Sequence, residues 1–269
     1  MTSAKKSLAR LVLRCPQGFG PGYSPITRRR ERVAGTGIDF GILRLPPGKA
    51  HTLSPGLETA ALLLSGEVKF AVGGLEHRAS RASYFDQTPV AMHVCSRDSM
   101  LVHAASDAEL AVFRVENTAQ FATELFDEKS MIETEDRGAG LLEGTAQRTV
   151  RTLFDRRNRP EAQLELGEVV NRPGRWSSYP PHHHPQPEIY HYRFAPTQGY
   201  GHCELGEQVV KVRNFDTVKI LDNNDHPQVA APGYRMFYIW AIRHLPHNPY
   251  TVPEFTAEHA WTLAPGAPR

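Results

Sequence analysis

The chain has 269 residues, enough for one large hydrophobic core or two smaller ones, because domains commonly hold about 100 to 200 residues. Its 31 basic and 29 acidic side chains give a net charge of +2, which argues against nucleic acid or an anionic membrane as partner. The three cysteines are far apart and fit neither a disulfide framework nor a metal knuckle. No apolar run approaches the roughly 20 residues of a membrane helix, and we expect a cytoplasmic protein.

Short β-rich segments, broken by glycine and proline, run through both halves of the sequence and predict an all-β sandwich or barrel. The expected strands in the first half are 38–45, 58–64, 67–72, 91–94, 101–104 and 109–116. Those in the second half are 164–170, 189–194, 208–212, 217–221, 228–231 and 236–242. The pairs Ser65-Gly66 and Gly73-Gly74 predict two tight hairpin turns.

The middle of the chain is more polar and charged than either flank. We interpret 119–160 as a connector between a barrel at 1–118 and a barrel at 161–269, with 120–126 as its best helix candidate. The words "LRLPPGKAHTL" and "GEVVNRPGRWSSYPPHHH" each predict a strand, a proline-glycine turn and a second strand. The sequence therefore predicts a repeated β-domain.

The stretch "SSYPPHHHPQPEIYHYRF" sets three consecutive histidines among prolines ahead of a carboxylate. Strand alternation points His182 and His184 to one face and His183 to the other, and Glu188 keeps the parity of the first two. Two imidazoles and one carboxylate suit zinc, iron, manganese, nickel or cobalt. His226, which follows another predicted strand in "NNDHPQ", is the candidate fourth ligand. For any one of these histidines, an exposed turn position is the alternative.

This ligand pattern resembles the first and second motifs of the cupin superfamily of small β-barrels. The words "GRWSSYPPHHH", "EIYHYRFAPTQGYG" and "HPQVAAPGYRMFYIW" more specifically resemble the bacterial 5-deoxy-glucuronate isomerase family of inositol breakdown. The resemblance implies two tandem cupin barrels, the first metal-free and the second holding one divalent ion on His182, His184, Glu188 and His226. Zinc is the expected ion, with manganese, iron, nickel or cobalt as alternatives.

Three positions depart from the pattern of that family. The family usually has lysine where this chain has His183, aspartate where it has Pro185, and a Gly-Tyr pair where it has Asn224-Asp225. These departures fall near the expected mouth of the substrate site.

The resemblance implies an aldose-ketose isomerase that converts 5-deoxy-glucuronate to 5-dehydro-2-deoxy-gluconate, with the ion as a Lewis acid. Its substrate is a small uronic-acid-type molecule, and a homo-oligomer is possible. The sister family, the 5-dehydro-4-deoxy-glucuronate isomerases of pectin breakdown, is the nearest alternative. An Fe(II) dioxygenase and a non-catalytic sugar-binding protein are alternatives of other classes.

Four side chains are the candidates for catalysis. Tyr190 and Tyr192 share the parity of Glu188, and Tyr238 follows the fourth ligand at an even spacing, so each can be a hydroxyl donor in the pocket or a packed core aromatic. A uronate carboxylate favours an arginine fork, for which Arg175 is the candidate near the motif.

Overall fold

The computed structural model describes residues 8–264. Within that range the regular secondary structure is almost entirely strand, and helix is limited to residues 8–11 and two 3-10 turns, Leu142–Gly144 and Ala260–Leu263. None of the helices in residues 8–264 combines the length and the apolar character needed to cross a membrane. The chain forms two compact units. The N-terminal unit holds residues 17–133 and 151–166, and the C-terminal unit holds the described residues of 1–16, 134–150 and 167–269.

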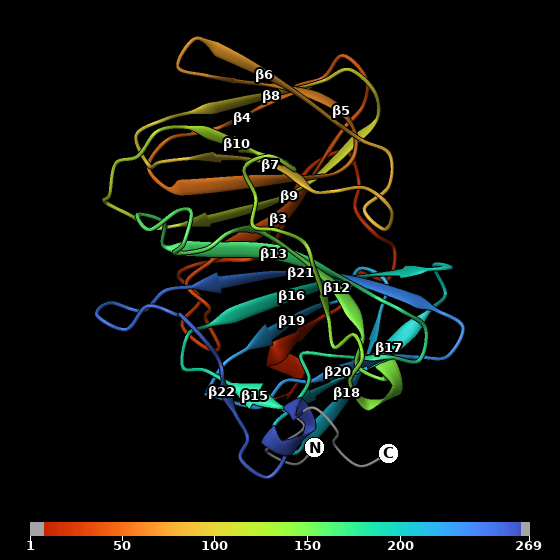
Figure 1. Ribbon diagram of the computed structural model, residues 1–269. Helices are drawn as coiled ribbons and strands as arrows, with labels where there is room; N and C mark the ends of the chain where they lie inside the picture. Colours follow the sequence, from red (N-terminus) through yellow and green to blue (C-terminus); the bar gives the residue numbers. More distant parts are fainter. Residues whose placement is uncertain (1–7, 265–269) are drawn as a thin grey trace. The chain divides into compact units, whose positions relative to one another are not determined.

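The N-terminal unit is built on the long strand β5. Its strands are β2 (Gly22–Thr27), β3 (Asp39–Leu45), β4 (Ala50–Leu53), β5 (Glu58–Val72), β6 (Leu75–Arg81), β7 (Val90–Val94), β8 (Met100–Ala104), β9 (Ala108–Val115) and β10 (Glu124–Phe126). They pair in the order β10-β7-β5-β9-β3-β2, and β6 and β8 also pair with β5 (Figure 1). Alternate side chains of these strands, among them Leu43, Phe70 and Val112, form one buried core.

The predicted hairpin at Ser65-Gly66 is wrong, because β5 runs unbroken through this pair. The register against β9 shifts between Leu63 and Ser65, which marks a β-bulge. Gly66 has a φ of +97°, and a Cβ there would lie 2.3 Å from the carbonyl oxygen of Asp107. The pair therefore bends a strand, whereas the predicted turn at 73–74 is confirmed between the paired residues Val72 and Leu75.

The helix predicted at 120–126 is also wrong, because residues 124–126 form β10 and pair with β7. Phe126 is fully buried on this strand, with its ring 5.1 Å from that of Phe154. Tertiary packing of an aromatic side chain thus prevails over a weak local helix preference.

The C-terminal unit contains three sheets. The strands are β1 (Val12–Leu13), β11 (Glu135–Arg137), β12 (Arg148–Phe154), β13 (Leu164–Asn171), β14 (Trp176–Ser177), β15 (His182–His183), β16 (Glu188–Ala195), β17 (Tyr200–Leu205), β18 (Gln208–Arg213), β19 (Thr217–Ile220), β20 (Gln228–Ala230), β21 (Arg235–Arg243) and β22 (Glu254–Phe255). The sheet orders are β1-β19-β16-β21-β13-β12-β11, β14-β20-β17-β18 and β15-β22. The chain passes between the two units within β12 and β13.

Strand β16 is central to this unit because it pairs with β19 on one side and β21 on the other (Figure 1). Its alternation places Glu188, Tyr190 and Tyr192 on one face, and the Tyr190 ring lies 4.7 Å from that of Tyr238, which comes from β21. Burial on both faces explains why β16 is apolar or aromatic at most positions. A rigid strand with neighbours on both sides therefore positions the glutamate of the motif.

Candidate metal centre

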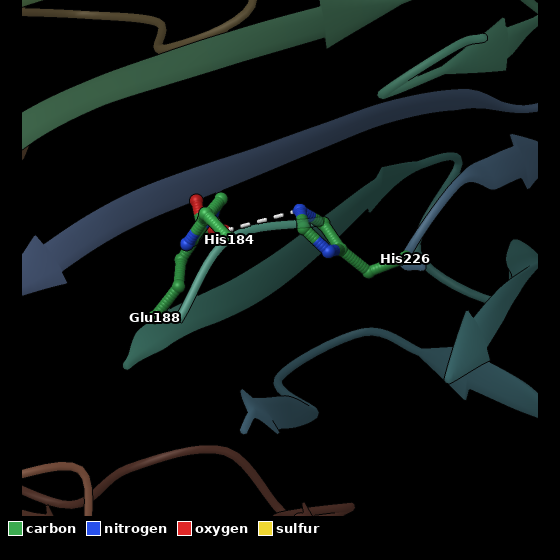
Figure 2. Close-up of side chains that lie close together, drawn as sticks. All are labelled: His184, Glu188 and His226. Atoms are coloured by element: carbon green, nitrogen blue, oxygen red, sulfur yellow. Dashed lines mark hydrogen bonds and ion pairs between the residues drawn. The ribbon is translucent and has the colours of Figure 1, made fainter. Parts of the chain in front are cut away.

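Three of the four predicted ligands converge in the C-terminal unit. Figure 2 shows His184, from the segment that leads into β16, and Glu188, the first residue of β16, facing His226 from the loop before β20. Their ligand atoms all lie within 4.8 Å of one another. The Oε2 atom of Glu188 is 3.2 Å from Nε2 of His184 and 3.4 Å from Nε2 of His226. Ligand atoms that surround one ion at about 2.1 Å are themselves roughly 3.0 to 3.4 Å apart.

The histidine rings are oriented by backbone carbonyl groups. Nδ1 of His182 lies 3.0 Å from the carbonyl oxygen of Pro180, Nδ1 of His184 lies 2.9 Å from that of Gln186, and Nδ1 of His226 lies 2.9 Å from that of Asn224. A carbonyl oxygen can only accept, so each Nδ1 carries the proton and donates it. The opposite nitrogen, Nε2, therefore presents a lone pair, which is the arrangement found in metal-ligating histidines.

This cluster of acceptors is suited to hold a cation. Burial lowers the pKa of His226 to about 3, so its ring is neutral at physiological pH. Its Nε2 atom is buried without a hydrogen-bond donor among the described residues, and the Oε2 atom of Glu188 lies 3.4 Å from it. Nitrogen lone pairs facing a carboxylate at this distance repel one another unless a positive charge lies between them. The donor set thus fits a divalent ion.

His182 lies beside this group. Its ring centroid is 4.8 Å from that of His226, edge to face, and burial lowers its pKa to about 4. The ring of Phe255, in β22, packs 5.8 Å away on another side. His182 is half-buried and also lines a cavity, so it stands at the edge of the cluster.

The middle histidine of the triplet points elsewhere. Nδ1 of His183 is 2.8 Å from Oδ1 of Asp225, and Oδ2 of Asp225 accepts a hydrogen bond of 2.6 Å from Thr256. Strand alternation explains the difference between this ring and its two neighbours.

Hydroxyl groups line the interior next to the histidines. Ser178 Oγ lies 2.9 Å from Tyr190 Oη and 3.5 Å from Tyr238 Oη, and Ser177 Oγ lies 2.7 Å from Tyr238 Oη. The Tyr190 ring is 5.9 Å from that of His226. Burial raises the pKa of both tyrosines, so their hydroxyls stay protonated and can donate.

The other two predicted catalytic residues do not join this row. Tyr192 is buried beside Cys203, and its pKa is raised first by burial and then by that thiol. Arg175 is half-buried in the turn before β14, where its backbone carbonyl accepts from Asn171 and Ala230. In the described part of the chain, the side chain of Arg175 belongs neither to the ligand cluster nor to the lining of the cavity beside His182.

Several residues of the site carry no distinctive pattern in the sequence. Tyr250 packs edge-on against His184 at 4.8 Å, and Gln186 donates to the carbonyl oxygen of Asn248 at 2.9 Å. Gln228 is fully buried, and its Nε2 lies 3.4 Å from Ser178 Oγ. Ser178 belongs to the stretch "GRWSSYPPHHH", so the resemblance of this stretch to the family could have identified it as a site residue.

His93, a buried histidine of the N-terminal unit, has hydrogen-bond partners at both ring nitrogens. His93 Nε2 is 3.0 Å from Glu58 Oε1, and its Nδ1 accepts from Nε of Arg159 at 3.2 Å. Both ring nitrogens are thus engaged by protein groups, and Phe154 stacks on the ring at 4.3 Å. This histidine is a structural tie between strands and chain segments of its own unit.

A β-barrel unit with a His-x-His pair, a following glutamate and a later histidine defines a cupin, and comparison with solved structures supports that class. A cupin 2 conserved barrel domain protein from Leptotrichia buccalis matches with a TM-score of 0.50 and 9% identity, covering 84% of this chain and 92% of that chain. An IolB-like protein from Salmonella typhimurium matches with a TM-score of 0.84 and 22% identity, covering 94% of this chain and 99% of that chain. The predicted all-β fold of two cupin barrels is confirmed.

Residues 14–262 match the model of the KduI/IolB family, and the chain belongs to that family. A 5-deoxy-glucuronate isomerase from Geobacillus thermodenitrificans is 29% identical over 61% of this chain, and the match spans 63% of that relative's length. The predicted family is therefore confirmed.

Proposed function

We propose that the protein is a metal-dependent aldose-ketose isomerase that converts 5-deoxy-glucuronate to 5-dehydro-2-deoxy-gluconate in inositol breakdown. Membership of the KduI/IolB family and relatives named 5-deoxy-glucuronate isomerase support this substrate. The observation that carries the chemistry is the cluster of His184, Glu188 and His226, whose acceptor atoms face one another. The substrate is accordingly a small sugar acid.

The metal ligands of this proposal are His184, Glu188 and His226, with His182 as the fourth. Neutral imidazoles and a carboxylate favour zinc, and the same set accepts manganese, iron, nickel or cobalt. A bound divalent ion would supply Lewis-acid polarisation of the substrate carbonyl.

Isomerisation moves hydrogen without net oxidation. A proton leaves C2 and one arrives at C1, while the O2 hydroxyl loses its proton and the O1 carbonyl oxygen gains one. Tyr190 and Tyr238 keep their hydroxyl protons because burial raises their pKa, so they suit the role of donors to the substrate oxygens. Ser178 lies between the two hydroxyls and can pass a proton from one to the other.

Gln228 supports the orientation of the substrate. Its Oε1 atom is buried without a hydrogen-bond donor among the described residues. An unpaired buried carbonyl oxygen costs about 1 to 3 kcal/mol, which a donor from a substrate hydroxyl would recover. We assign this amide to a hydroxyl group of the sugar chain.

The test is turnover of 5-deoxy-glucuronate by metal-loaded protein, followed by the aldehyde proton signal in NMR. We expect loss of that signal and growth of a ketone product, with no oxygen uptake, and no reaction after chelation. The control is a Glu188→Gln variant, which keeps the shape of the side chain but removes its charge.

Other outcomes identify the alternatives. Turnover of 5-dehydro-4-deoxy-glucuronate in preference to 5-deoxy-glucuronate would assign the protein to the sister activity. Oxygen consumption dependent on iron would contradict isomerisation and indicate a dioxygenase. Sugar-acid binding without any turnover by metal-loaded protein would indicate a non-catalytic cupin.

A further inference from the structure

A cavity of about 140 Å³ opens beside His182 in the C-terminal unit. One part of its wall is apolar, formed by Leu141, Leu142, Pro253, Phe255 and Leu263. The charged groups in the wall are Arg137 and Arg148, and no acidic residue lines it among residues 8–264. The cavity is therefore positive and selects against cationic ligands.

Arg148 is buried, with 5% of its surface exposed, on strand β12. Its NH1 group donates to the carbonyl oxygen of Ala146 at 2.8 Å, and its NH2 group donates to that of Tyr179 at 3.1 Å. These two bonds orient the guanidinium group and leave its other N–H donors unused by the described residues, because a guanidinium carries five. Gly138 permits this packing, since a Cβ there would lie 2.6 Å from the carbonyl oxygen of Ala146, which accepts from Arg148.

The positive charge of Arg148 has no carboxylate partner among the described residues. Glu135, on the neighbouring strand, is held by Arg137 through two hydrogen bonds of 3.1 and 2.7 Å. Burial lowers the pKa of Arg148 to about 10, so the group is still charged at neutral pH. A buried charge without a counterion is costly, and such a cost is tolerated where a ligand supplies the missing charge.

We infer that Arg148 binds the carboxylate of the sugar acid and so sets the preference of this cavity for an acid over a neutral sugar. This inference rests on the proposed function for the identity of the substrate. The position is suitable because Arg148 and His182 line one cavity. The charge of Arg148 also influences His182 and Tyr238. Arg137 is the weaker candidate because it is half exposed and already paired with Glu135.

The role of Arg148 in binding the carboxylate is tested with Arg148→Gln, Arg148→Lys and the matched control Arg151→Gln. Arg151 lies on the same strand, is also buried and also donates to backbone carbonyls, those of Tyr84 and Gln87, but it does not line the cavity. Thermal unfolding and metal content show that each variant is folded and loaded. The rate measurement compares 5-deoxy-glucuronate with 5-deoxy-glucose, its neutral analogue.

We expect Arg148→Gln to lower kcat/KM for the acid about 10- to 100-fold, the loss of a charged hydrogen bond, and to leave the neutral analogue within about threefold. Arg148→Lys should retain part of the preference, because it keeps the charge but not the fork. Arg151→Gln should leave the ratio of the two rates unchanged. An unchanged ratio in Arg148→Gln overturns the inference while the isomerase proposal stands.

Binding separates this inference from the proposed function. Calorimetric titration of metal-loaded protein with D-glucuronate and D-glucose requires no turnover. The inference is supported if the native protein binds the acid more tightly than the neutral sugar and Arg148→Gln loses this difference. If Arg148→Gln does not fold, a reduced difference in Arg148→Lys serves the same purpose. Either result holds even if 5-deoxy-glucuronate is not isomerised. Equal binding of acid and neutral sugar by the native protein overturns it.

Discussion

His183 and Asp225 are bonded to each other, with Nδ1 of the histidine 2.8 Å from Oδ1 of the aspartate. Both are positions at which the chain departs from the pattern of the family it resembles, and the two departures therefore form one contact. Thr256 donates to the other oxygen of Asp225, so the contact also reaches the segment that follows β22. The contact lies outside the ligand cluster of His184, Glu188 and His226.

A double-mutant cycle with His183→Ala and Asp225→Ala tests this pairing. The two groups are partly exposed, so we expect a coupling of about 0.5 to 1.5 kcal/mol in the free energy of unfolding from denaturant titrations. Each variant should also speed hydrogen exchange at the amide of Thr256, which bonds to the carbonyl oxygen of Pro181 at 3.0 Å. Strict additivity of the two single changes would show that the contact contributes nothing.

Metal content should distinguish neighbouring histidines of the triplet. His184→Ala removes a buried nitrogen that lies 3.2 Å from Glu188, and we expect at least a tenfold loss of affinity for zinc, measured by competition with a chelator. His183→Ala is the matched control, because its ring faces Asp225, and it should keep nearly all of its metal. Equal losses in the two variants would contradict the assignment of faces.

The sequence predicts the strands that hold the site because they are short runs rich in β-branched and aromatic residues, bounded by glycine, proline and asparagine. The parity of His182, His184 and Glu188 likewise follows from local geometry. The partnership with His226 does not, because it depends on how strands distant in the sequence return to one another. The resemblance to a family indicates that His226 is the further ligand, which the pattern alone leaves open.

The errors have physical causes. Ser65-Gly66 has the composition of a turn, but the same φ range also serves a β-bulge, and only the pairing of β5 with β9 decides between them. Arg148 lies in a segment interpreted as a connector, whereas it belongs to β12 and lines the cavity. The burial of Arg148 and its lack of a carboxylate partner are properties of the folded chain, whereas Arg175 is suggested by its closeness to the motif in the sequence.

Removing single hydroxyls should slow catalysis without releasing metal. Tyr190→Phe and Tyr238→Phe each delete a hydroxyl that bonds to a serine, and we expect kcat to fall about 10- to 100-fold through the loss of a donor to the substrate. Tyr200→Phe, on β17, is the control, because that ring stacks with Lys211 and lies outside the hydroxyl row. Unchanged kcat in both test variants would indicate that the two tyrosines only pack.

The stability of the metal-free protein should depend on pH through the buried imidazoles. Burial lowers the pKa of His182 to about 4 and of His226 to about 3, whereas unfolded histidine has a pKa of about 6.5. Between these values the unfolded chain binds protons that the folded chain excludes. The free energy of unfolding therefore falls as pH drops below about 6.5, by up to roughly 1.4 kcal/mol per pH unit for each histidine, until the folded pKa is reached.

Replacement of one histidine isolates its share of that slope. His226→Asn should flatten the decrease in the free energy of unfolding between pH 6.5 and about 4, because the unfolded chain then has one proton-binding group fewer and the folded chain no longer buries that imidazole. The measurement is urea unfolding in the presence of chelator. His202→Asn removes an exposed imidazole on β17 and should leave the slope as it was. Zinc at saturating concentration should raise stability and steepen the dependence on pH, because protons then compete with the ion for the same nitrogen atoms. An identical slope in the native protein and in His226→Asn would contradict this expectation. It would mean that the His226 ring takes up its proton as readily in the folded chain as in the unfolded one. The acceptor cluster would then need no metal to balance it.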